Sequence, residues 1–370
     1  MNYKKEIKLS IIGTRGIPAS YGGFETSVEE TARRFASKGI KTDIYCRSNH
    51  YRKKINIYNG SNLIYVWSPR NKFFDTIVST FLSIILLLKR KSNIVISYGV
   101  GNAMLIPFLS IFSVPVISVV DGADWRREKW GFFPKIYLKI NSFFATKFSK
   151  TVVVDSVITR EWYQKKYNYK CTYIPYGFTK KNKFDKNILK KYYLSDKKYI
   201  VFVGRFEKEK GVEFLIDNFN KLKTDYSLVV IGGNKLDEKY ELKIKEMGNQ
   251  NVIYLGFLYG KDYFNILKHA YFYVSTSYIE GTSPSLLNAM GINGFALVSN
   301  IEENIETLHG SCATFKVGDP EDFIDKVSYY LNNGEVIKRE KNKTKKIVDK
   351  YYDWENITNK YISEIVKHLM

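Results

Sequence analysis

The stretch EGTSPSLLNAMG, residues 280–291, sets one carboxylate, a glycine, two hydroxyls and a proline in front of a short apolar run. It follows a nearly continuous apolar segment, so we expect it at the carboxyl end of a buried strand and the amino end of a helix. Free backbone N–H groups and the positive end of a helix dipole favour an anion there. Gly281 allows close approach, Pro284 suits the first turn because it has no N–H, and the hydroxyls of Thr282 and Ser283 can donate hydrogen bonds. The pattern indicates a phosphate-binding turn; the alternative is that Ser283 only caps the helix.

A second stretch, VGRFEKEKG at residues 203–211, supplies two cations. Arg205 ends a predicted strand and Lys210 stands just before the next helix, so we expect both at the same sheet edge as the first stretch. A guanidinium fork and an ammonium point charge at a helix start can hold a diphosphate without a metal ion. The sequence contains no Asp-x-Asp pair, and we expect no metal. A solvated charge run is the alternative for residues 207–209.

A glycine-rich loop, GTRGIPASYGGFETSVEE, begins at Gly13 between a predicted strand and a predicted helix. Its four glycines permit backbone conformations that wrap a phosphate or let a ligand approach. It is not the dinucleotide fingerprint, because it has no Gly-x-Gly and Pro18 interrupts the expected helix start. We expect a ligand loop; a plain tight turn is the alternative.

The elements that position these loops follow a repeated α/β pattern. Strand-like runs alternate with helical ones, which is typical of a parallel sheet covered on both faces. At 370 residues the chain is too long for one typical core. The first-half strands are expected at residues 8–13, 42–46, 63–67, 94–97, 116–120, 151–154 and 171–174. The second-half strands are expected at 199–205, 227–232, 252–254 and 271–274, and the helices at 212–222, 236–247, 262–269 and 354–368.

We therefore predict an α/β protein of two tandem doubly wound domains, residues 1–178 and 192–353, that face a central cleft. The stretch before residue 192 is polar and lysine-rich and is predicted to be a linker. The C-terminal helix, about 354–370, can pack back on the first domain. Ligands of such sheets bind beyond the carboxyl ends of the strands, so a shared site is expected in the cleft.

The cysteines and the first residues bear on location. Cys46, Cys171 and Cys312 are odd in number and lack metal-ligand spacing, which indicates reduced thiols. The opening has only a strand-length apolar run and no cleavage site, so we expect no secretory signal. A cytoplasmic protein is predicted.

The formal charge of +21 is concentrated in the first half. Residues 1–190 contain 33 Lys and Arg against 12 Asp and Glu, whereas residues 191–370 contain 25 of each. This asymmetry indicates an anionic partner for the first half; nucleic acid and the cytoplasmic leaflet both qualify.

Two apolar segments raise the question of a membrane span. Residues 92–120 carry no charge, but glycines and prolines divide them into a strand, a helix at 102–112 and a second strand, so a buried core is favoured over a transmembrane helix. Residues 76–88 are too short for a span. A buried helix is preferred there; an interfacial helix followed by the cations at 89–91 is the alternative.

These motifs together resemble the GT-B glycosyltransferases, specifically the retaining family four. GTRGIPASYGGFET and DGADWRREKW (residues 121–130) resemble signatures of the bacterial rhamnosyltransferase subgroup. VGRFEKEKG and EGTSPSLLNAMG match the general donor-domain signatures. The four motifs fall in the family order over nearly the whole chain.

The resemblance implies a donor site in the second half. Arg205 and Lys210 would grip the nucleotide diphosphate, and Glu280, the first acid of the family's paired-acid motif, would touch sugar hydroxyls. The second acid, which usually holds the ribose hydroxyls, falls on Asn288, so a weaker contact or a different ribose is expected. Gly256 and Phe257 would lie near the base. The implied donor-binding residues are Gly16, Gly204, Arg205, Lys210, Gly256, Phe257, Glu280, Gly281, Thr282, Ser283, Pro284 and Asn288.

The resemblance also implies retention of anomeric configuration by front-face attack. The leaving diphosphate oxygen would help to remove the acceptor proton, and no protein nucleophile would be required. Asp121 or Glu25 could instead orient or deprotonate the acceptor; a helix cap and a first-turn acid are the respective alternatives. Glu280 as a strand-end surface acid is an alternative as well. The implied catalytic residues are Glu280, Asp121, Arg205 and Lys210. The implied acceptor-binding residues are Arg15, Tyr21, Gly22, Gly23, Glu25, Asp121, Trp125 and Arg126.

The predicted function is therefore transfer of a sugar, with rhamnose favoured, from a dTDP- or UDP-linked donor to a glycan or polyprenyl-diphosphate-linked acceptor in cell-surface polysaccharide synthesis. No further cofactor is expected. The cations at 89–91 with Arg126, Arg127 and Lys129 could seat the first half peripherally on the inner face of the cell membrane. Trp125 and Trp130 could reach that interface, stack on a sugar or belong to the core.

Two other classes remain open. A nucleotide-sugar epimerase on the same fold would need no acceptor and no basic membrane face. A non-catalytic nucleotide-sugar or nucleic-acid binding protein is the other class. Nucleic acid is not expected, because the basic loops lack interleaved aromatics and a helix-turn-helix pattern.

Overall fold

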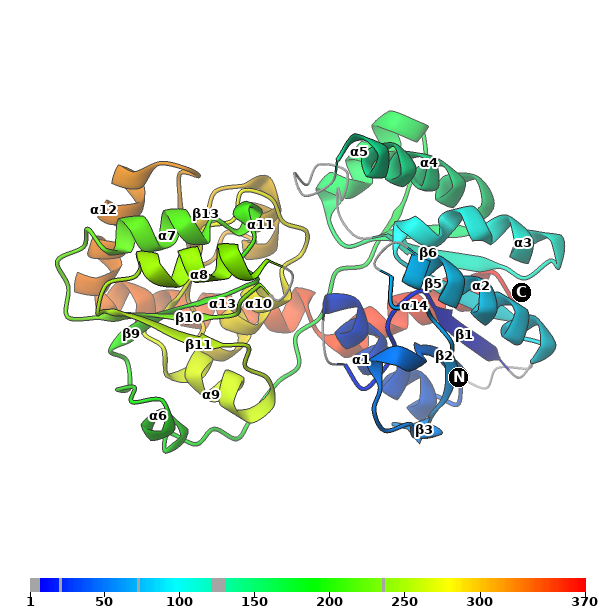
Figure 1. Ribbon diagram of the computed structural model, residues 1–370, viewed down its shortest axis with the longest axis horizontal. Coiled ribbons are helices and arrows are strands. Elements are labelled where there is room, and N and C mark those ends of the chain that lie inside the picture. Colours follow the sequence, from blue (N-terminus) through cyan, green and yellow to red (C-terminus); the bar gives the residue numbers. More distant parts are fainter. Residues whose placement is uncertain (1–6, 20–21, 72–73, 121–130, 235–236) are drawn as a thin grey trace. The chain divides into compact units, whose positions relative to one another are not determined.

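The computed structural model describes residues 7–19, 22–71, 74–120, 131–234 and 237–370. The chain divides into two compact units (Figure 1). Unit 1 comprises Met1–Tyr176 together with Trp354–Met370, and unit 2 comprises Gly177–Asp353. Each unit contains one largely parallel sheet with helices on its faces, which confirms the predicted α/β class.

Unit 1 is built on an eight-stranded sheet in the order β3-β4-β2-β1-β5-β6-β7-β8. All pairs are parallel except β3 with β4. Strands β5 and β6 are buried along their whole length, as expected for continuous apolar runs covered on both faces. The strands are β1 Lys8–Ile12, β2 Lys41–Arg47, β3 Ile57–Tyr58, β4 Ser61–Val66, β5 Ile94–Tyr98, β6 Val116–Val120, β7 Thr151–Val154 and β8 Thr172–Tyr173.

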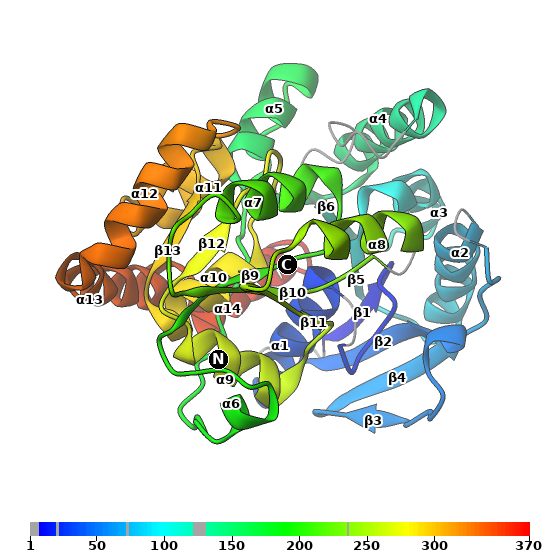
Figure 2. The same ribbon diagram turned by 60° about the vertical axis from the view of Figure 1, so that its left-hand side comes forward.

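The helices of unit 1 cover both faces of this sheet. Helices α2, α3 and α4 lie side by side on one face (Figure 2). The segment 92–120 forms β5, η2, α3 and β6, so the predicted buried core is confirmed. The helical piece predicted at 102–112 is present in two consecutive parts: a 3-10 helix precedes α3, which begins next to Pro107, a residue without an N–H. The helices are α1 Gly23–Ser37, η1 Ser48–His50, α2 Phe74–Lys89, η2 Val100–Leu105, α3 Ile106–Ile111, α4 Phe132–Phe148, α5 Val157–Tyr167 and α14 Trp354–Lys367.

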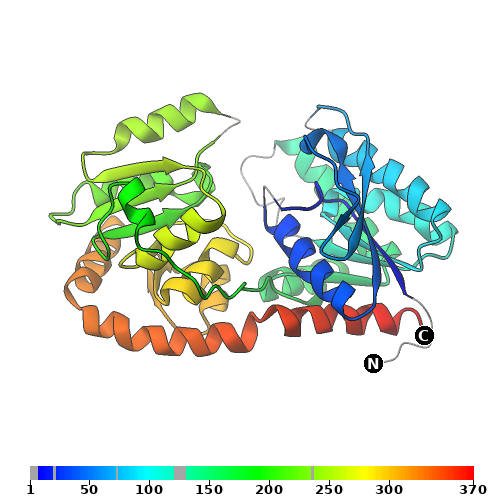
Figure 3. The same cartoon turned by 90° about the horizontal axis from the view of Figure 1, so that it is seen from below.

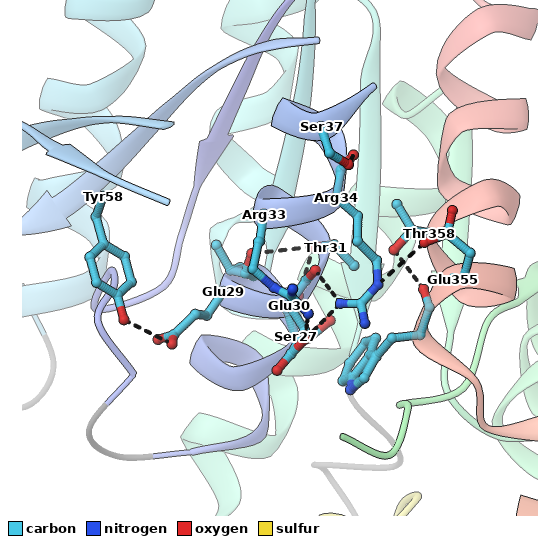
Figure 4. Close-up of polar contacts among 12 residues, drawn as sticks. Ser27, Glu29, Glu30, Thr31, Arg33, Arg34, Ser37, Tyr58, Glu355 and Thr358 are labelled. Atoms are coloured by element: carbon cyan, nitrogen blue, oxygen red, sulfur yellow. Dashed lines mark hydrogen bonds and ion pairs between the residues drawn. The ribbon is translucent and has the colours of Figure 1, made fainter. Parts of the chain in front are cut away.

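Helix α14 returns to unit 1 and packs on α1 (Figure 3). It buries an apolar stripe that includes Trp354 and Tyr361. Figure 4 shows Arg34 of α1 directed toward Glu355 of α14, with 3.6 Å between Nε and Oε2. Lys38 Nζ lies 2.5 Å from the other carboxylate oxygen of Glu355. The packing therefore rests on a buried apolar stripe edged by ion pairs.

Unit 2 has a six-stranded parallel sheet in the order β11-β10-β9-β12-β13-β14. Helices α7 and α8 lie on one face and α9 on the other (Figure 1). The strands are β9 Tyr199–Val203, β10 Ser227–Ile231, β11 Val252–Gly256, β12 Tyr273–Ser275, β13 Ala296–Ser299 and β14 Ala313–Phe315. The helices are α6 Ile188–Lys191, η4 Lys208–Lys210, α7 Val212–Phe219, α8 Glu238–Met247, α9 Gly260–His269, α10 Pro284–Asn288, η5 Ala289–Asn293, α11 Glu302–Leu308, α12 Pro320–Asn332 and α13 Gly334–Tyr351.

One strand boundary is corrected by the structure. The strand predicted at 199–205 ends at Val203, and Arg205 lies in the loop that follows. The chain leaves the sheet there because Phe206 turns into the core, where it is fully buried.

Candidate active site

The candidate site lies at the switch point of the unit 2 sheet. Strands β9 and β12 are parallel neighbours, with Val201 opposite Tyr273. The next strand along the chain lies on one side for β9 and on the other side for β12, and ligands of open α/β sheets bind beyond the carboxyl ends of the strands at such a point. The predicted cationic loop follows β9, and the predicted phosphate-binding turn follows β12.

Backbone contacts join these two loops to each other. The backbone N–H of Tyr278 donates to the carbonyl oxygen of Glu209 at 2.8 Å. Thr276 Oγ1 donates to the carbonyl oxygen of Gly211 at 2.9 Å. Gly211 has a φ of +64°, and a Cβ there would lie 2.1 Å from the carbonyl oxygen of Thr276. Only glycine fits at this position, and the close approach sets the position of Lys210.

Lys210 and Glu280, both predicted as site residues, meet in the structure. Lys210 Nζ lies 2.5 Å from Glu280 Oε1, and the two side chains are 16% and 8% exposed. Ser277 Oγ donates to the same oxygen at 2.8 Å. Ser299 at the end of β13 donates to the carbonyl oxygen of Ser277 at 2.5 Å. A cation and a carboxylate are thus held at the switch point by a hydroxyl network that the sequence analysis did not identify.

Arg205 has a different partner. Its Nη1 lies 2.7 Å from Glu207 Oε1, on the same loop. The Arg205 side chain is 38% exposed, so this ion pair is open to water and to exchange for another anion. Gly204 lies directly between β9 and Arg205.

The turn after β12 caps the helix that follows it. Ser283 is the N-cap of α10 and its Oγ accepts the N–H of Leu286 at 3.5 Å, so the capping role is present. Pro284 occupies the first helical turn, as predicted. Gly281 and Thr282 are buried together with Ser283. Helix α10 continues into the π-helical turn η5, a feature often found at functional sites.

Asn288 ends α10 and faces Tyr263 of α9. Its Nδ2 donates to the Tyr263 hydroxyl at 3.3 Å. Burial raises the pKa of Tyr263 to about 12, so the hydroxyl stays protonated at neutral pH. The amide therefore has a neutral partner that a sequence pattern does not reveal. Gly256 closes β11 at the same sheet edge, and Phe257 follows it.

The glycine-rich loop of unit 1 is held by acids of α1. Glu25 is 6% exposed, and its Oε1 accepts the N–H of Arg15 at 3.1 Å. Gly16 has a φ of +110°, and a Cβ there would lie 2.4 Å from Cys46 Sγ. Gly22 is the N-cap of α1 and Gly23 its first residue. Glu25 thus has the position of a first-turn acid and fixes the loop backbone.

Arg47, at the end of β2, is a residue of this loop region that the sequence analysis missed. It is 6% exposed; its Nη2 donates to the carbonyl oxygen of Gly13 at 3.0 Å, and its Nη1 lies 2.9 Å from Asp75 Oδ2. His50 Nε2 lies 3.4 Å from the same oxygen. Burial lowers the pKa of Arg47, and the Asp75 carboxylate opposes this shift. The available signal was an arginine directly after the strand predicted at 42–46.

Four of the predicted residues, Tyr21, Asp121, Trp125 and Arg126, lie outside the described residues. So do Arg127, Lys129 and Trp130. Among the residues that are described, no group of three or more His, Cys, Asp and Glu is placed to hold a metal ion. Within the same ranges, no helix combines the length and apolar character needed to cross a membrane.

Comparisons with family descriptions divide the chain as the units do. Residues 184–347 match the family described as "Glycosyl transferases group 1". Residues 6–179 match "Domain of unknown function (DUF1972)". The site built around Lys210 and Glu280 lies within the first of these matches.

Comparisons with curated proteins give partial matches. An uncharacterized glycosyltransferase of Methanocaldococcus jannaschii is 26% identical over 45% of this chain and 43% of its own length. N-acetylgalactosamine-N,N'-diacetylbacillosaminyl-diphospho-undecaprenol 4-alpha-N-acetylgalactosaminyltransferase of Campylobacter jejuni is 28% identical over 30% of this chain and 31% of its own length. The matched segments span less than half of either relative.

Solved structures match the chain over nearly its full length. Sucrose-phosphate synthase from Thermosynechococcus elongatus has a TM-score of 0.83 at 16% identity, covering 98% of this chain and 99% of that one. The Anabaena protein HepE, in complex with UDP and glucose, has a TM-score of 0.77 at 12% identity, covering 98% and 100%. The chain has the GT-B fold, as predicted, and the family match supports a glycosyltransferase.

Proposed function

We propose that the chain is a retaining glycosyltransferase that transfers rhamnose from a dTDP- or UDP-linked donor to a glycan or a polyprenyl-diphosphate-linked acceptor. The observation that carries this proposal is the Lys210–Glu280 pair at the switch point of a sheet whose residues match group 1 glycosyl transferases. The cation of this pair is proposed to bind the diphosphate and the acid to bind the sugar hydroxyls, so the two parts of a nucleotide sugar would be held at adjacent positions.

The relatives support the kinds of substrate. The Campylobacter jejuni relative is named for a diphospho-undecaprenol acceptor. HepE was solved with UDP and glucose. Rhamnose as the donor sugar rests on the resemblance of residues 13–26 and 121–130 to the rhamnosyltransferase subgroup.

The proposed reaction needs no metal ion and no protein nucleophile. The diphosphate would replace Glu207 as the ion-pair partner of Arg205 and Glu280 as the partner of Lys210. Both cations would then stabilise the charge developing on the leaving oxygen. The backbone of the turn at 281–284 would face the diphosphate, and Glu280 would bind the sugar hydroxyls. The front-face route lets the departing oxygen accept the acceptor proton, with Asp121 or Glu25 proposed to orient the acceptor.

The proposed location is the inner face of the cell membrane, to which unit 1 would attach peripherally during cell-surface polysaccharide synthesis. Arg90 is paired with Asp43, with 2.7 Å between Nε and Oδ2, whereas Lys89 and Lys91 are exposed. Lysines at this helix end would face anionic headgroups.

Thermal-shift measurements against nucleotide sugars test the donor. Stabilisation by dTDP-rhamnose or a UDP-sugar, lost in Arg205→Ala and kept in Lys208→Ala, is expected. No stabilisation by any nucleotide sugar would count against the proposal. Conversion of the donor sugar with no acceptor present would instead favour an epimerase.

A further inference from the structure

Residues 44–74 of unit 1 carry positive charge with no carboxylate among them. The stretch contains six Lys and Arg and no Asp or Glu. Arg52, Lys53 and Arg70 are exposed, and no ion pair joins any of them to another residue of the part of the chain that the structure describes. Clustered exposed cations raise the local concentration of anions.

The two acids that bound this stretch are engaged with other residues. Asp43 Oδ2 lies 2.7 Å from Arg90 Nε, and Asp43 Oδ1 accepts the amide N–H of Asn62 at 2.8 Å. Asp75 Oδ2 lies 2.9 Å from Arg47 Nη1. Because both acids already have partners, the three exposed cations remain open to the anionic group of a ligand.

Ring and backbone contacts hold the cationic loop 52–54 against strand β4. Strands β2 and β4 are parallel neighbours, so both end at the same edge of the sheet (Figure 2). The ring centroids of Tyr51 and Tyr65 lie 5.7 Å apart. Tyr65 Oη also accepts the backbone N–H of Ile55 at 3.1 Å. The loop is therefore tied on both sides to one residue near the carboxyl end of β4.

Trp67 adds an aromatic surface beside this loop. It is 63% exposed, directly follows the last residue of β4 and stands two positions after Tyr65. Because side chains alternate along an extended backbone, Trp67 is expected on the same face of β4 as Tyr65. An exposed indole offers a flat apolar surface against which the C–H face of a sugar ring can pack. We define the basic patch as Arg52, Lys53, Trp67 and Arg70.

The basic patch adjoins the glycine-rich loop of unit 1. The backbone N–H of Arg47 donates to the carbonyl oxygen of Arg15 at 2.9 Å, and Arg47 Nη2 donates to the carbonyl oxygen of Gly13 at 3.0 Å. Arg47 is also paired with Asp75 in the first turn of α2. One buried arginine thus joins the segments that follow β1, β2 and β4, and a glycan lying along this edge would contact both the loop and the basic patch.

The composition of the basic patch favours an acidic saccharide as the ligand. Three cations around one ring suit a short ligand that combines a negative group with an apolar ring face. A single strand of nucleic acid stacks successive bases on several rings, and the basic patch has one. A neutral glycan would leave the cations without a partner.

We propose that the basic patch is a subsite for an acidic sugar residue of the acceptor glycan. Arg52, Lys53 and Arg70 bind its carboxylate or phosphate, and Trp67 packs on its ring. The reacting hydroxyl then lies further along the glycan, toward the glycine-rich loop. The role of this glycan as the acceptor rests on the proposed function, whereas its binding is measured without a donor and without turnover.

Calorimetric titration of the full chain with tetragalacturonate and with maltotetraose, an uncharged saccharide of the same length, tests the proposal. We expect tetragalacturonate to bind at least about tenfold more tightly than maltotetraose. Arg52→Gln/Lys53→Gln should weaken tetragalacturonate binding about tenfold or more, and Trp67→Ser about threefold to tenfold. The matched control is Lys165→Gln/Lys166→Gln, which removes the same charge from two exposed lysines of α5, a helix that contacts β7 and β8 at the other end of the sheet. This control should bind tetragalacturonate as the wild type does.

Other results would overturn the proposal. Equal affinity of the wild type for the charged and the neutral saccharide, or an equal loss of affinity in the α5 control, contradicts a subsite. If Arg52→Gln/Lys53→Gln instead weakens binding of a single-stranded oligonucleotide or of phosphatidylglycerol vesicles and leaves tetragalacturonate binding unchanged, the basic patch belongs to nucleic acid or to a lipid surface. The proposed function fails separately, when no nucleotide sugar gives a thermal shift although tetragalacturonate still binds at the basic patch.

Discussion

Lys210 Nζ lies 2.5 Å from Glu280 Oε1, so the cation proposed for the donor diphosphate is paired with the acid proposed for the donor sugar. Ser277 donates to the same oxygen and keeps that acid in place. A bound diphosphate must compete with Glu280 for the ammonium group. In the proposed function, we therefore expect the pair to set the affinity for the nucleotide as well as the position of the sugar.

Replacing Glu280 by glutamine tests this competition. Glu280→Gln removes the charge but keeps the shape and the bond from Ser277, so Lys210 becomes available to phosphate oxygens. We expect a nucleoside diphosphate without sugar to bind about threefold to tenfold more tightly, because it no longer has to break the charged hydrogen bond between Lys210 and the carboxylate. Turnover should fall at least about a hundredfold, since the sugar loses its carboxylate. Calorimetric titration and a transfer assay measure the two quantities.

Ser277→Ala is the matched control for that experiment. It leaves both charges and removes only the hydroxyl, so nucleotide affinity should change little while turnover falls moderately. Parallel loss of nucleotide affinity and turnover in Glu280→Gln would show that the acid does not compete for Lys210.

Sequence patterns predicted the framework of this site well. Parallel strands place their ends at one edge, so VGRFEKEKG and EGTSPSLLNAMG could be assigned to neighbouring loops, and Lys210 does meet Glu280. The hydroxyl network around this pair was not predicted, because part of it comes from another strand. Ser299 donates to Ser277 from β13, a strand of four residues that is too short to show an alternation of apolar and polar residues.

The side of each helix that faces the core was harder to predict. The apolar run of α2 indicated a buried helix, and Ile84 and Leu87 are buried in the core, but Ser83 is buried beside them while Phe81 faces outward. A run that is apolar on every side has no periodicity to orient it, and only the packing against η2 decides. Helix α13 has the opposite difficulty, because its many lysines hide the positions that it buries, such as Ile337 and Val348.

A second prediction concerns the ribose. Asn288→Glu introduces the carboxylate that the paired-acid motif of family four places there, next to the protonated hydroxyl of Tyr263. Because UDP has a 2'-hydroxyl that dTDP lacks, the variant should favour UDP over dTDP by about tenfold more than the wild type does. Competitive binding of the two nucleotides measures the ratio. Asn288→Gln, which stays neutral, should leave the ratio unchanged, and an unchanged ratio in Asn288→Glu would remove this residue from the ribose site.

The third prediction uses two glycines of similar backbone conformation. Gly211 and Gly260 have φ values of +64° and +58°, but only at Gly211 would a Cβ meet another atom, the carbonyl oxygen of Thr276 at 2.1 Å. Gly260→Ala should cost about 1 kcal/mol of unfolding free energy from the left-handed conformation alone. Gly211→Ala should cost about 3 kcal/mol or more, because the loop must also move. Urea unfolding measures both, and equal costs would refute the contact that holds the two site loops together.

The last prediction is a pH dependence centred on Lys197. Its Nζ donates to the carbonyl oxygens of Lys268 and Ala270 at 2.7 and 2.8 Å, at the end of α9. Burial, together with the nearby charges of Lys341 and Lys268, lowers the pKa of Lys197 to about 8, although Asp196 opposes this shift. The unfolded chain, with a lysine pKa of about 10.4, then binds this proton more tightly than the folded chain between about pH 8 and pH 10.

Stability contributed by Lys197 must therefore rise with pH across that window. From pH 7.5 to 9.5 we expect the wild type to gain about 1 to 2 kcal/mol of unfolding free energy relative to Lys197→Met, after allowance for partial solvent screening. Comparing the two proteins cancels the contributions of tyrosines and cysteines that titrate in the same pH range. Lys198→Met, one residue along and exposed, is the control and should follow the wild type. A constant difference between the wild type and Lys197→Met at all pH values would show that this ammonium group keeps its proton throughout the window.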